Sequence, residues 1–439
     1  MLNLIKSINN FVWGIPLPLL LLGTHLYFTV KLKGVQKHIK KSIKLSVSSE
    51  DEAAGDISSF AALSATLAAT IGTGNIVGIS TAIALGGPGA LFWCWLTGLF
   101  GMATSYAECY LGVLYRRKTS DGSYIGGPMY ALEYGLNKKW LAVLFSYLTL
   151  IASFGVSCST QARAVTETAH SLWNLPEYAV GMTVAVLVGL VIIGGVKSIG
   201  KICSRLVPAM GFFYIGGCLI ILVLNYKYLL PAINLIIKSA FIPSKLPAAV
   251  AGGFIGSTIR SAARYGIARG LFTNEAGLGS AAIAAAGAKV SSPSRQALVS
   301  MSATFWDTVV MCAITGLVIV SNLLKNPSSV AGYSFTEFTT AAFAAIPFGR
   351  ICLGLSLIAF AVATLIGWSY FGEKAVEYLF GKSGIGTYQI CYIVMIFIGS
   401  IMTLDLVWEL TDLVNAGMVI PNLICLILLR KKIPPYEDK

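Results

Sequence analysis

The chain has 439 residues, of which 56% are hydrophobic and only 12% are charged. A soluble domain carries about 25% charged residues, so this composition excludes a protein whose main solvent is water. The formal net charge of +13 suggests nucleic acid, but the lysines and arginines fall almost entirely between apolar stretches, which is typical of membrane topology.

Apolar stretches long enough to cross a bilayer recur along the whole chain. A hydrocarbon core of about 30 Å requires about 20 apolar residues per helix. The first stretch is too long for the core of a signal peptide and has no small-residue cleavage site, so it is predicted to be a true helix. We predict about eleven helices, near residues 11–32, 58–85, 89–115, 140–160, 178–196, 203–224, 247–263, 297–322, 350–374, 387–403 and 407–430.

The basic residues predict the orientation of the chain. If the loop after the first helix is cytoplasmic, most of the 32 lysines and arginines lie on the cytoplasmic side. The positive-inside rule then places the N-terminus outside the cell membrane and the C-terminus in the cytoplasm. An odd number of helices agrees with this orientation.

A basic segment separates the first two predicted helices. Val35, Ile39 and Ile43 recur every four residues, which gives an apolar stripe. The lysines beside this stripe are Lys37, Lys40, Lys41 and Lys44. Two interpretations stay open: an interfacial helix on anionic headgroups, and an ordinary solvated basic loop.

Glycines interrupt two of the apolar segments in the middle. The predicted second helix contains Gly72 and Gly74, and the predicted seventh contains Gly252, Gly253 and Gly256. The two interruptions lie five helices apart, as expected if helices 2–6 and 7–11 were inverted halves with the first helix outside the repeat. Paired interruptions of this kind are typical of a transporter site at the membrane midplane.

Broken helices can bind a ligand with their own backbone. Freed backbone groups are tolerated only where the break faces protein or a cavity, because lipid offers no hydrogen bonds. Helix ends at such a break can bind an amino-acid carboxylate and a sodium ion together, and Thr73 and Asn75 add oxygens there. The alternative is that the glycines only permit close helix packing, but their paired positions favour a site.

These observations predict a division of the chain. The expected parts are an added N-terminal helix over 1–33, a cytoplasmic basic segment over 34–56, a first repeat over 57–225, a second repeat over 226–430 and a cytoplasmic tail over 431–439.

Several acidic residues are predicted at or near membrane depth, where an ionisable side chain is a functional candidate. They are Glu108, Asp307, Glu409 and Asp412. Asp307 lies well inside its helix, where coupling or gating is one interpretation and a pair with a buried basic residue is the other.

Motifs spread over nearly the whole chain resemble the alanine or glycine:cation symporter family. They are Ala69–Asn75, Gly86–Trp93, Gly126–Tyr130, Arg269–Ala281 and Gly367–Lys374. Cys94, where methionine is expected, and Ala282, where relatives often have proline, are minor departures. The resemblance implies a leucine-transporter-like five-plus-five fold with one extra N-terminal helix. It also implies uptake of alanine or glycine with sodium, or with protons in some members.

By similarity, the substrate carboxylate is assigned to the first break, and the second break completes the pocket. The implied substrate-binding residues are Thr70, Gly72, Thr73, Gly74, Asn75, Phe154, Gln161, Gly256, Ser257 and Trp368. Gln161 looks like the family's pocket glutamine, although a polar link between helices is the alternative. Trp368 and Phe154 would exclude branched side chains, since one extra methylene in a tight site costs about 1–3 kcal/mol. Trp368 could equally be a packing aromatic.

The fold implied by the resemblance has a sodium site made of carbonyls before the first break and a hydroxyl from the ninth helix. In this chain these ligands are Ala68, Ile71 and Thr364. Sodium is a hard cation that prefers oxygen ligands, so neutral groups suffice. A bond from Thr364 to its own helix is the alternative.

The remaining candidates concern coupling and gating. Asn274 and Glu275 lie in a cytoplasmic signature of the family, where helix capping and an inner gate both fit. Asp307 and Glu108 become the leading candidates if protons drive transport.

Other function classes fit less well. No filter motif suggests an ion channel, no stretch reads as a P-loop, and none of His25, His38 and His170 lies near a nucleophile motif. We expect no cofactor beyond the co-transported cation, no nucleic acid and no obligate protein partner. The expected partners are alanine or glycine, sodium or protons, and the lipid bilayer.

Overall fold

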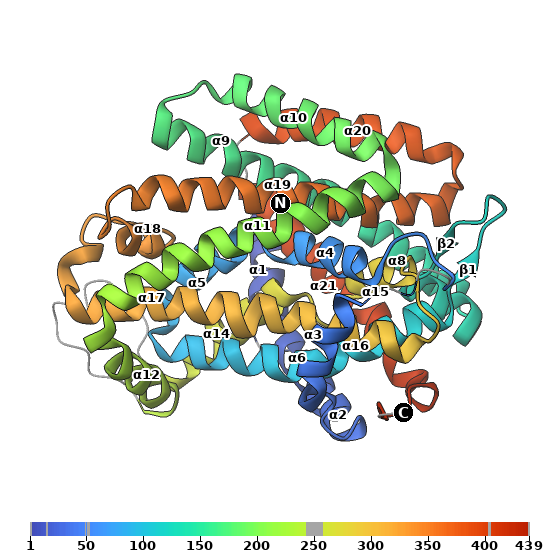
Figure 1. The fold of residues 1–439 in the computed structure, drawn as a ribbon, viewed down its shortest axis with the longest axis horizontal. Coiled ribbons are helices and arrows are strands. Elements are labelled where there is room, and N and C mark those ends of the chain that lie inside the picture. The colour runs from blue at the N-terminus through green and yellow to red at the C-terminus, as the bar shows by residue number, and fades with distance from the viewer. Residues whose placement is uncertain are drawn as a thin grey trace.

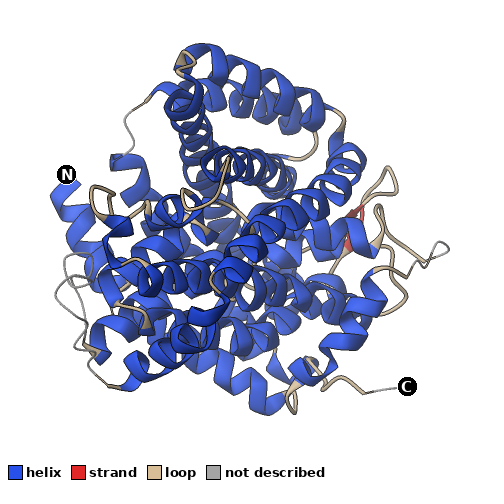
Figure 2. Ribbon diagram, turned by 60° about the vertical axis from the view of Figure 1, so that its left-hand side comes forward, coloured by secondary structure: helices blue, strands red, loops and turns tan. Residues whose placement is uncertain are grey.

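The computed structural model describes residues 2–14, 16–48, 50, 53–242, 258–402 and 405–437. These residues are almost entirely helical (Figure 2), and the short hairpin of β1 (Arg117–Lys118) and β2 (Tyr124–Ile125) contains the only strands among them. The all-α membrane class predicted from the sequence is confirmed.

The helices follow one another with short connections (Figure 1). Before the hairpin they are α1 (Leu2–Val12), α2 (Pro16–Lys31), η1 (Val35–His38), α3 (Ile39–Ser46), α4 (Ser59–Thr70), η2 (Thr73–Asn75), α5 (Val77–Gly86) and α6 (Gly89–Leu114). After it come α7 (Pro128–Tyr130), η3 (Ala131–Gly135), α8 (Lys139–Ala152), η4 (Ser153–Ser159), α9 (Thr160–Trp173), α10 (Glu177–Ile193), α11 (Gly195–Leu224) and α12 (Tyr226–Phe241). From residue 258 onward they are α14 (Ile259–Asn274), α15 (Ser280–Ala286), α16 (Pro293–Thr304), η5 (Phe305–Cys312), α17 (Ala313–Lys325), η6 (Pro327–Val330), α18 (Phe338–Phe343), α19 (Gly349–Phe380), α20 (Ser383–Ile401), α21 (Asp405–Leu428) and η7 (Arg430–Lys432).

Seven helical stretches of the described residues are long and apolar enough to cross a membrane, and the bent pair of Ser59–Thr70 and Thr73–Gly86 makes an eighth. The predicted count of about eleven helices stays a prediction. Helices α6, α10 and α14 do not reach the same length and apolarity. The helix predicted over 247–263 lies mainly outside the described residues.

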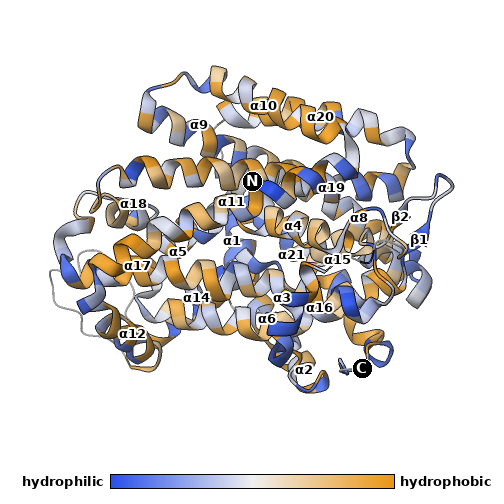
Figure 3. Cartoon of the chain, in the orientation of Figure 1, coloured by the Kyte–Doolittle hydropathy of each residue, from blue (hydrophilic) through white to orange (hydrophobic). Residues whose placement is uncertain are grey.

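The outer helices present large apolar side chains to their surroundings. Leu190 on α10, Phe212 on α11 and Ile390 on α20 are all exposed. Figure 3 shows α10 and α20 as neighbouring, largely hydrophobic helices, and the two pack against each other. Apolar surface on this scale requires lipid rather than water around it. The chain is therefore a multi-pass membrane protein.

The predicted fourth helix, over 140–160, is longer in the structure. Helices α8, η4 and α9 run continuously from Lys139 to Trp173. The sequence prediction ended early because polar residues such as Gln161 and Arg163 interrupt the apolar signal. Arg163 is balanced near the helix end by Glu167, at 2.7 Å, and by Glu177. No helix was predicted over residues 226–241, where the structure has α12.

The basic segment after α2 is helical rather than a loop. Helix α3 packs against α16, and the Ser42 hydroxyl donates a hydrogen bond of 2.6 Å to the carbonyl of Leu298. Ser42 and Ser46 are buried, whereas Lys40 and Lys44 are exposed. Helix α3 thus packs on protein along one face, and its contact with headgroups stays a prediction.

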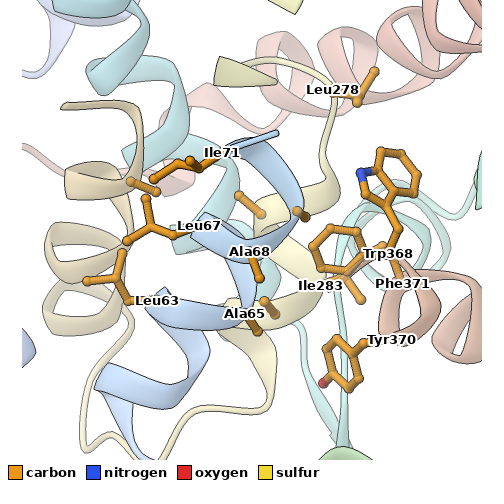
Figure 4. Packing of buried hydrophobic residues seen from close by; sticks show 14 of the residues in the cluster. Leu63, Ala65, Leu67, Ala68, Ile71, Leu278, Ile283, Trp368, Tyr370 and Phe371 are labelled. Atoms are coloured by element: carbon orange, nitrogen blue, oxygen red, sulfur yellow. The ribbon is translucent and has the colours of Figure 1, made fainter. Parts of the chain in front are cut away.

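The interior is built around α4 and α19, which approach each other closely. A Cβ atom at Gly367 of α19 would lie 2.7 Å from the backbone nitrogen of Ala69. Figure 4 shows the small side chains of Ala65 and Ala68 on α4, with Trp368 and Phe371 of α19 nearby. Small residues at such a contact let two helix backbones pack in lipid. This contact holds the end of α4 against α19.

Candidate functional site

The chain leaves helical geometry at the predicted first break. Helix α4 ends at Thr70, Ile71 has extended backbone angles, and the segments on either side are bent by 61°. The N–H of Gly72 donates to the side-chain Oδ1 of Asn75 at 3.0 Å. It therefore does not make the helical hydrogen bond to the carbonyl of Ala68. In the described part of the chain, no backbone N–H donates to the carbonyls of Ala68 through Ile71.

A buried hydrogen-bond network holds this break in place. The Nδ2 of Asn75 donates to the Oδ1 of Asp307 at 2.7 Å, and the Thr308 hydroxyl donates to the Oδ2 of Asp307 at 2.7 Å. Asn75 and Asp307 are both fully buried. Asp307 therefore has an amide and a hydroxyl as its partners instead of the basic residue considered above. Asn75 lies behind the break and does not line the cavity described next.

A cavity of about 400 Å³ opens beside the break. The predicted site residues that line it are Thr70, Gly72, Thr73, Gly74, Gln161, Thr364, Trp368 and Glu275. Side chains from α4, α9, α14 and α19 are thus brought together, although they lie up to about 300 residues apart in the sequence.

Gln161 and Thr364 converge on Gly72. The Nε2 of Gln161 donates to the Thr73 hydroxyl at 3.3 Å. A Cβ at Gly72 would lie 2.9 Å from the Thr364 Oγ1 and 3.7 Å from the Gln161 Nε2, so only glycine fits this approach. The Thr364 hydroxyl donates to the Phe360 carbonyl at 3.0 Å, which leaves its oxygen lone pairs for a further ligand.

Two acceptors beside the break are buried without a partner. The Oγ1 of Thr70 and the Oε1 of Gln161 have no hydrogen-bond partner among the described residues. An unpaired buried polar atom is costly, and at a cavity wall a bound ligand can satisfy it.

Glu275 links the loop after α14 to α19. Its backbone is left-handed, with a φ of 53°, and it ends α14. The indole N–H of Trp368 donates to one carboxylate oxygen at 3.1 Å, and the Ser280 hydroxyl donates to the other at 2.5 Å. This geometry suits a residue that fixes the loop against the cavity wall.

Two other candidates, Phe154 and Asn274, are not part of the cavity wall. The ring of Phe154 packs against Tyr388 and Tyr392 on α20, at centroid distances of 5.4 and 6.0 Å. Asn274 accepts a hydrogen bond from the N–H of Ala276, which is a capping contact. Gly256 and Ser257, assigned to the second break, lie outside the described residues.

Glu108 binds a loop instead of facing the cavity. Its Oε2 accepts hydrogen bonds from the N–H groups of Gly277 and Gly279, at 3.2 and 3.1 Å, and from the Nδ2 of Asn422 at 3.1 Å. It thus anchors the turn between α14 and α15.

The cavity wall also contains Arg269, Asp412 and Asn415, none of which was among the predicted substrate- or sodium-binding residues. Arg269 and Asp412 have side chains of opposite charge, and both line the cavity. Arg269 lies inside a motif quoted for the resemblance, and Asp412 was noted as an acid near membrane depth. A charge within an apolar segment was the available signal, but their pairing depends on how α14 and α21 pack.

Comparison with known proteins identifies the family of the chain. A model of the sodium:alanine symporter family matches residues 1–436. The sodium/alanine symporter AgcS of Methanococcus maripaludis is 45% identical over 435 residues, covering 97% of this chain and 94% of that protein. An uncharacterized transporter of Haemophilus influenzae is 43% identical over 433 residues, covering 98% and 94%.

Solved structures of low sequence identity share the fold. MhsT in complex with L-phenylalanine has a TM-score of 0.60 at 16% identity, covering 86% of this chain and 89% of that one. A substrate-bound, outward-open Na⁺-coupled sialic acid symporter has a TM-score of 0.59 at 12% identity, covering 94% and 86%. The chain therefore belongs to the sodium:alanine symporter family, and it is a cation-coupled amino-acid symporter of the leucine-transporter-like fold rather than an enzyme.

Proposed function

We propose that this symporter carries alanine or glycine into the cell together with sodium, by alternating access around the cavity at the break between α4 and α5. The observation that carries the proposal is the convergence of Gln161 and Thr364 on Gly72, at a point where the helix backbone is unwound. The name of the relative AgcS, a sodium/alanine symporter, supports the same substrate and cation.

The substrate carboxylate binds at the start of η2 in this proposal. The N–H groups of Thr73 and Gly74 donate to no backbone carbonyl in the described part of the chain. Free N–H groups at a helix start attract an anion. Gln161 then contacts the substrate from α9, Trp368 closes one side, and Gly256 and Ser257 complete the pocket by similarity. A small side chain fits between these walls best.

The sodium ion binds on the other side of the break. The carbonyls of Ala68 and Ile71 have lost their helical donors, and the Thr364 hydroxyl faces the same turn. Neutral oxygens of this kind suit a monovalent hard cation, because they need no buried acid.

Proton coupling is the second candidate. A Bacillus subtilis relative, 34% identical, is named a putative sodium/proton-dependent alanine carrier. In that case the buried carboxyls of Asp307 and Glu108 would be the groups to test. Another relative from the same species is named a probable sodium/glutamine symporter, so a larger substrate is the corresponding alternative.

The same proposal places the protein in the cell membrane with its N-terminus outside and its tail in the cytoplasm. The division into an added N-terminal helix and two inverted repeats, over 57–225 and 226–430, belongs to it as well. Its supports are the distribution of basic residues and the two interrupted helices.

The test is uptake of radiolabelled alanine and glycine into proteoliposomes that contain the purified protein. An inward sodium gradient is compared with an equal proton gradient, and empty liposomes are the control. Sodium-driven accumulation above the outside concentration supports the proposal and excludes a channel. Accumulation driven only by protons overturns the sodium assignment, and no accumulation of either amino acid overturns the substrate assignment.

A further inference from the structure

Helix α1 and the turn after it, which form the first part of the predicted N-terminal helix, pack against α21, a helix of the cavity wall. The Nδ2 of Asn9 donates to the backbone carbonyl of Glu409 at 2.7 Å and to its Oε2 at 2.8 Å. The indole N–H of Trp13 donates to the backbone carbonyl of Asp412 at 3.0 Å. Asn9 is only 6% exposed, so this contact is a buried polar interaction and not a surface one.

Of the two α21 residues held in this way, Asp412 lines the cavity, whereas Glu409 is not part of its wall. Asp412 and, one turn later, Asn415 line the 400 Å³ cavity, whose wall also includes Arg269. Trp13 therefore binds the peptide group of a residue whose side chain reaches the proposed transport site. The direction in which that side chain points depends on where this peptide group lies.

A second feature places α1 and α2 behind the same wall. A small cavity of about 20 Å³ is lined by Trp13 and Leu21 on one side and by Phe272, Glu275 and Asn415 on the other. Phe272, Glu275 and Asn415 also line the large cavity. The N-terminal segment thus lies close to three residues that also line the proposed substrate cavity.

We propose that the added N-terminal helix positions the substrate site, with Asn9 and Trp13 as positioning residues that fix the first turns of α21 and thereby Asp412 and Asn415. Neither residue touches the substrate in this proposal. The inference rests on the proposed function, which it deepens by giving the N-terminal helix a role in substrate affinity.

The first experiment measures alanine uptake kinetics of Trp13→Phe and Asn9→Leu, which remove the donors and keep similar volumes. Each is expected to raise the apparent KM about threefold to tenfold with little change in Vmax, because Trp13→Phe removes one hydrogen bond to α21 and Asn9→Leu removes two. The controls are Trp140→Phe and Asn10→Leu, since Trp140 is exposed and Asn10 is an exposed neighbour of Asn9. Unchanged KM values in the first two variants overturn the inference.

A double-mutant cycle tests the route through Asp412. If Trp13 acts by positioning Asp412, Trp13→Phe raises the KM of an Asp412→Ala protein by less than about twofold. A purely structural role for Trp13 predicts the full, additive increase, and that outcome contradicts the proposal. Size-exclusion elution and melting temperature show whether each variant is folded.

A measurement without substrate separates this inference from the proposed function. Asp412→Cys, in a Cys391→Ser background that removes an exposed thiol, is modified with a membrane-impermeant thiol reagent. Adding Trp13→Phe is expected to change the modification rate by about threefold or more. An unchanged rate overturns the positioning role, whereas failure of wild-type alanine uptake with a changed rate overturns only the proposed substrate.

Discussion

At the scale of single residues, the site depends on one glycine and one hydroxyl. Gly72 lets the side chains of Thr364 and Gln161 reach the unwound backbone, because a Cβ there would lie 2.9 Å from the Thr364 oxygen. Thr364 bonds back to the Phe360 carbonyl, as expected for a threonine in a helix, and its oxygen also lies beside Gly72 at the break. The bond to its own helix is thus present, and the sodium-binding role of Thr364 stays a prediction.

Thr364→Val tests the cation assignment at this scale. It keeps the side-chain shape and removes the hydroxyl, so the sodium concentration for half-maximal alanine uptake is expected to rise about tenfold, since a bond to a charged group is worth about 1.5–3 kcal/mol. The measurement is uptake against sodium concentration. Thr183→Val is the matched control, because Thr183 bonds back to Ala179 in the same way but is exposed on α10. Equal sodium titrations of the two variants would contradict the assignment.

At the scale of elements, the break between α4 and α5 is stabilised by a different part of the chain. Asn75 takes up the N–H of Gly72 and is itself held by Asp307 in η5, where the helix between α16 and α17 widens into a π-helix. Wide turns of this kind often occur at functional sites. Two helices that are interrupted at different points in the sequence thus meet at one buried network.

Asn75→Ala tests this network. Removing the amide leaves the carboxylate of Asp307 without one of its partners, so the free energy of unfolding is expected to fall by about 1–3 kcal/mol and uptake to be lost. Thermal melting in detergent and alanine uptake measure the two effects, with Asn10→Ala as an exposed control.

The coupling between the two side chains is measured with Asp307→Ala. If Asn75 and Asp307 stabilise the break as a pair, the double variant costs less than the sum of the single variants by about 1 kcal/mol or more. Additive losses would show that the hydrogen bond between them contributes nothing.

At the scale of the whole molecule, charge and apolar surface determine how the protein lies in the membrane. In the predicted topology most lysines and arginines lie on the cytoplasmic side, and the outer faces of α10, α11 and α20 are apolar. The N-terminal segment also packs on the cavity wall, because Asn9 and Trp13 donate hydrogen bonds to α21.

Cysteine labelling tests the predicted orientation. In a Cys391→Ser background, Lys6→Cys is expected to react with an impermeant maleimide in intact cells, and Lys431→Cys only after permeabilisation. The reverse pattern would show that the chain is inserted in the opposite orientation, and labelling of both in intact cells would contradict an odd number of spans.

The sequence alone determined the class of protein, the place of the first break and the family resemblance. A membrane-spanning helix consists of about 20 contiguous apolar residues, so it can be predicted from the sequence without knowledge of any tertiary contact. The break at Gly72–Gly74 was visible for the same reason, because glycine acts on its own backbone. Helix ends were harder to predict where polar residues such as Gln161 face protein instead of lipid. For this reason the predicted fourth helix ended at residue 160 and did not include α9.

Only the tertiary structure decided which side chains meet. Arg269, Asp412 and Asn415 line the cavity because α14 and α21 pack around it, whereas Asn75 lies behind the break and Phe154 packs on α20. These positions depend on contacts between residues hundreds of positions apart, and no local pattern encodes such contacts. The sequence identifies the polar residues that lie within apolar segments. Packing decides whether each of them forms hydrogen bonds with other protein groups or faces the cavity.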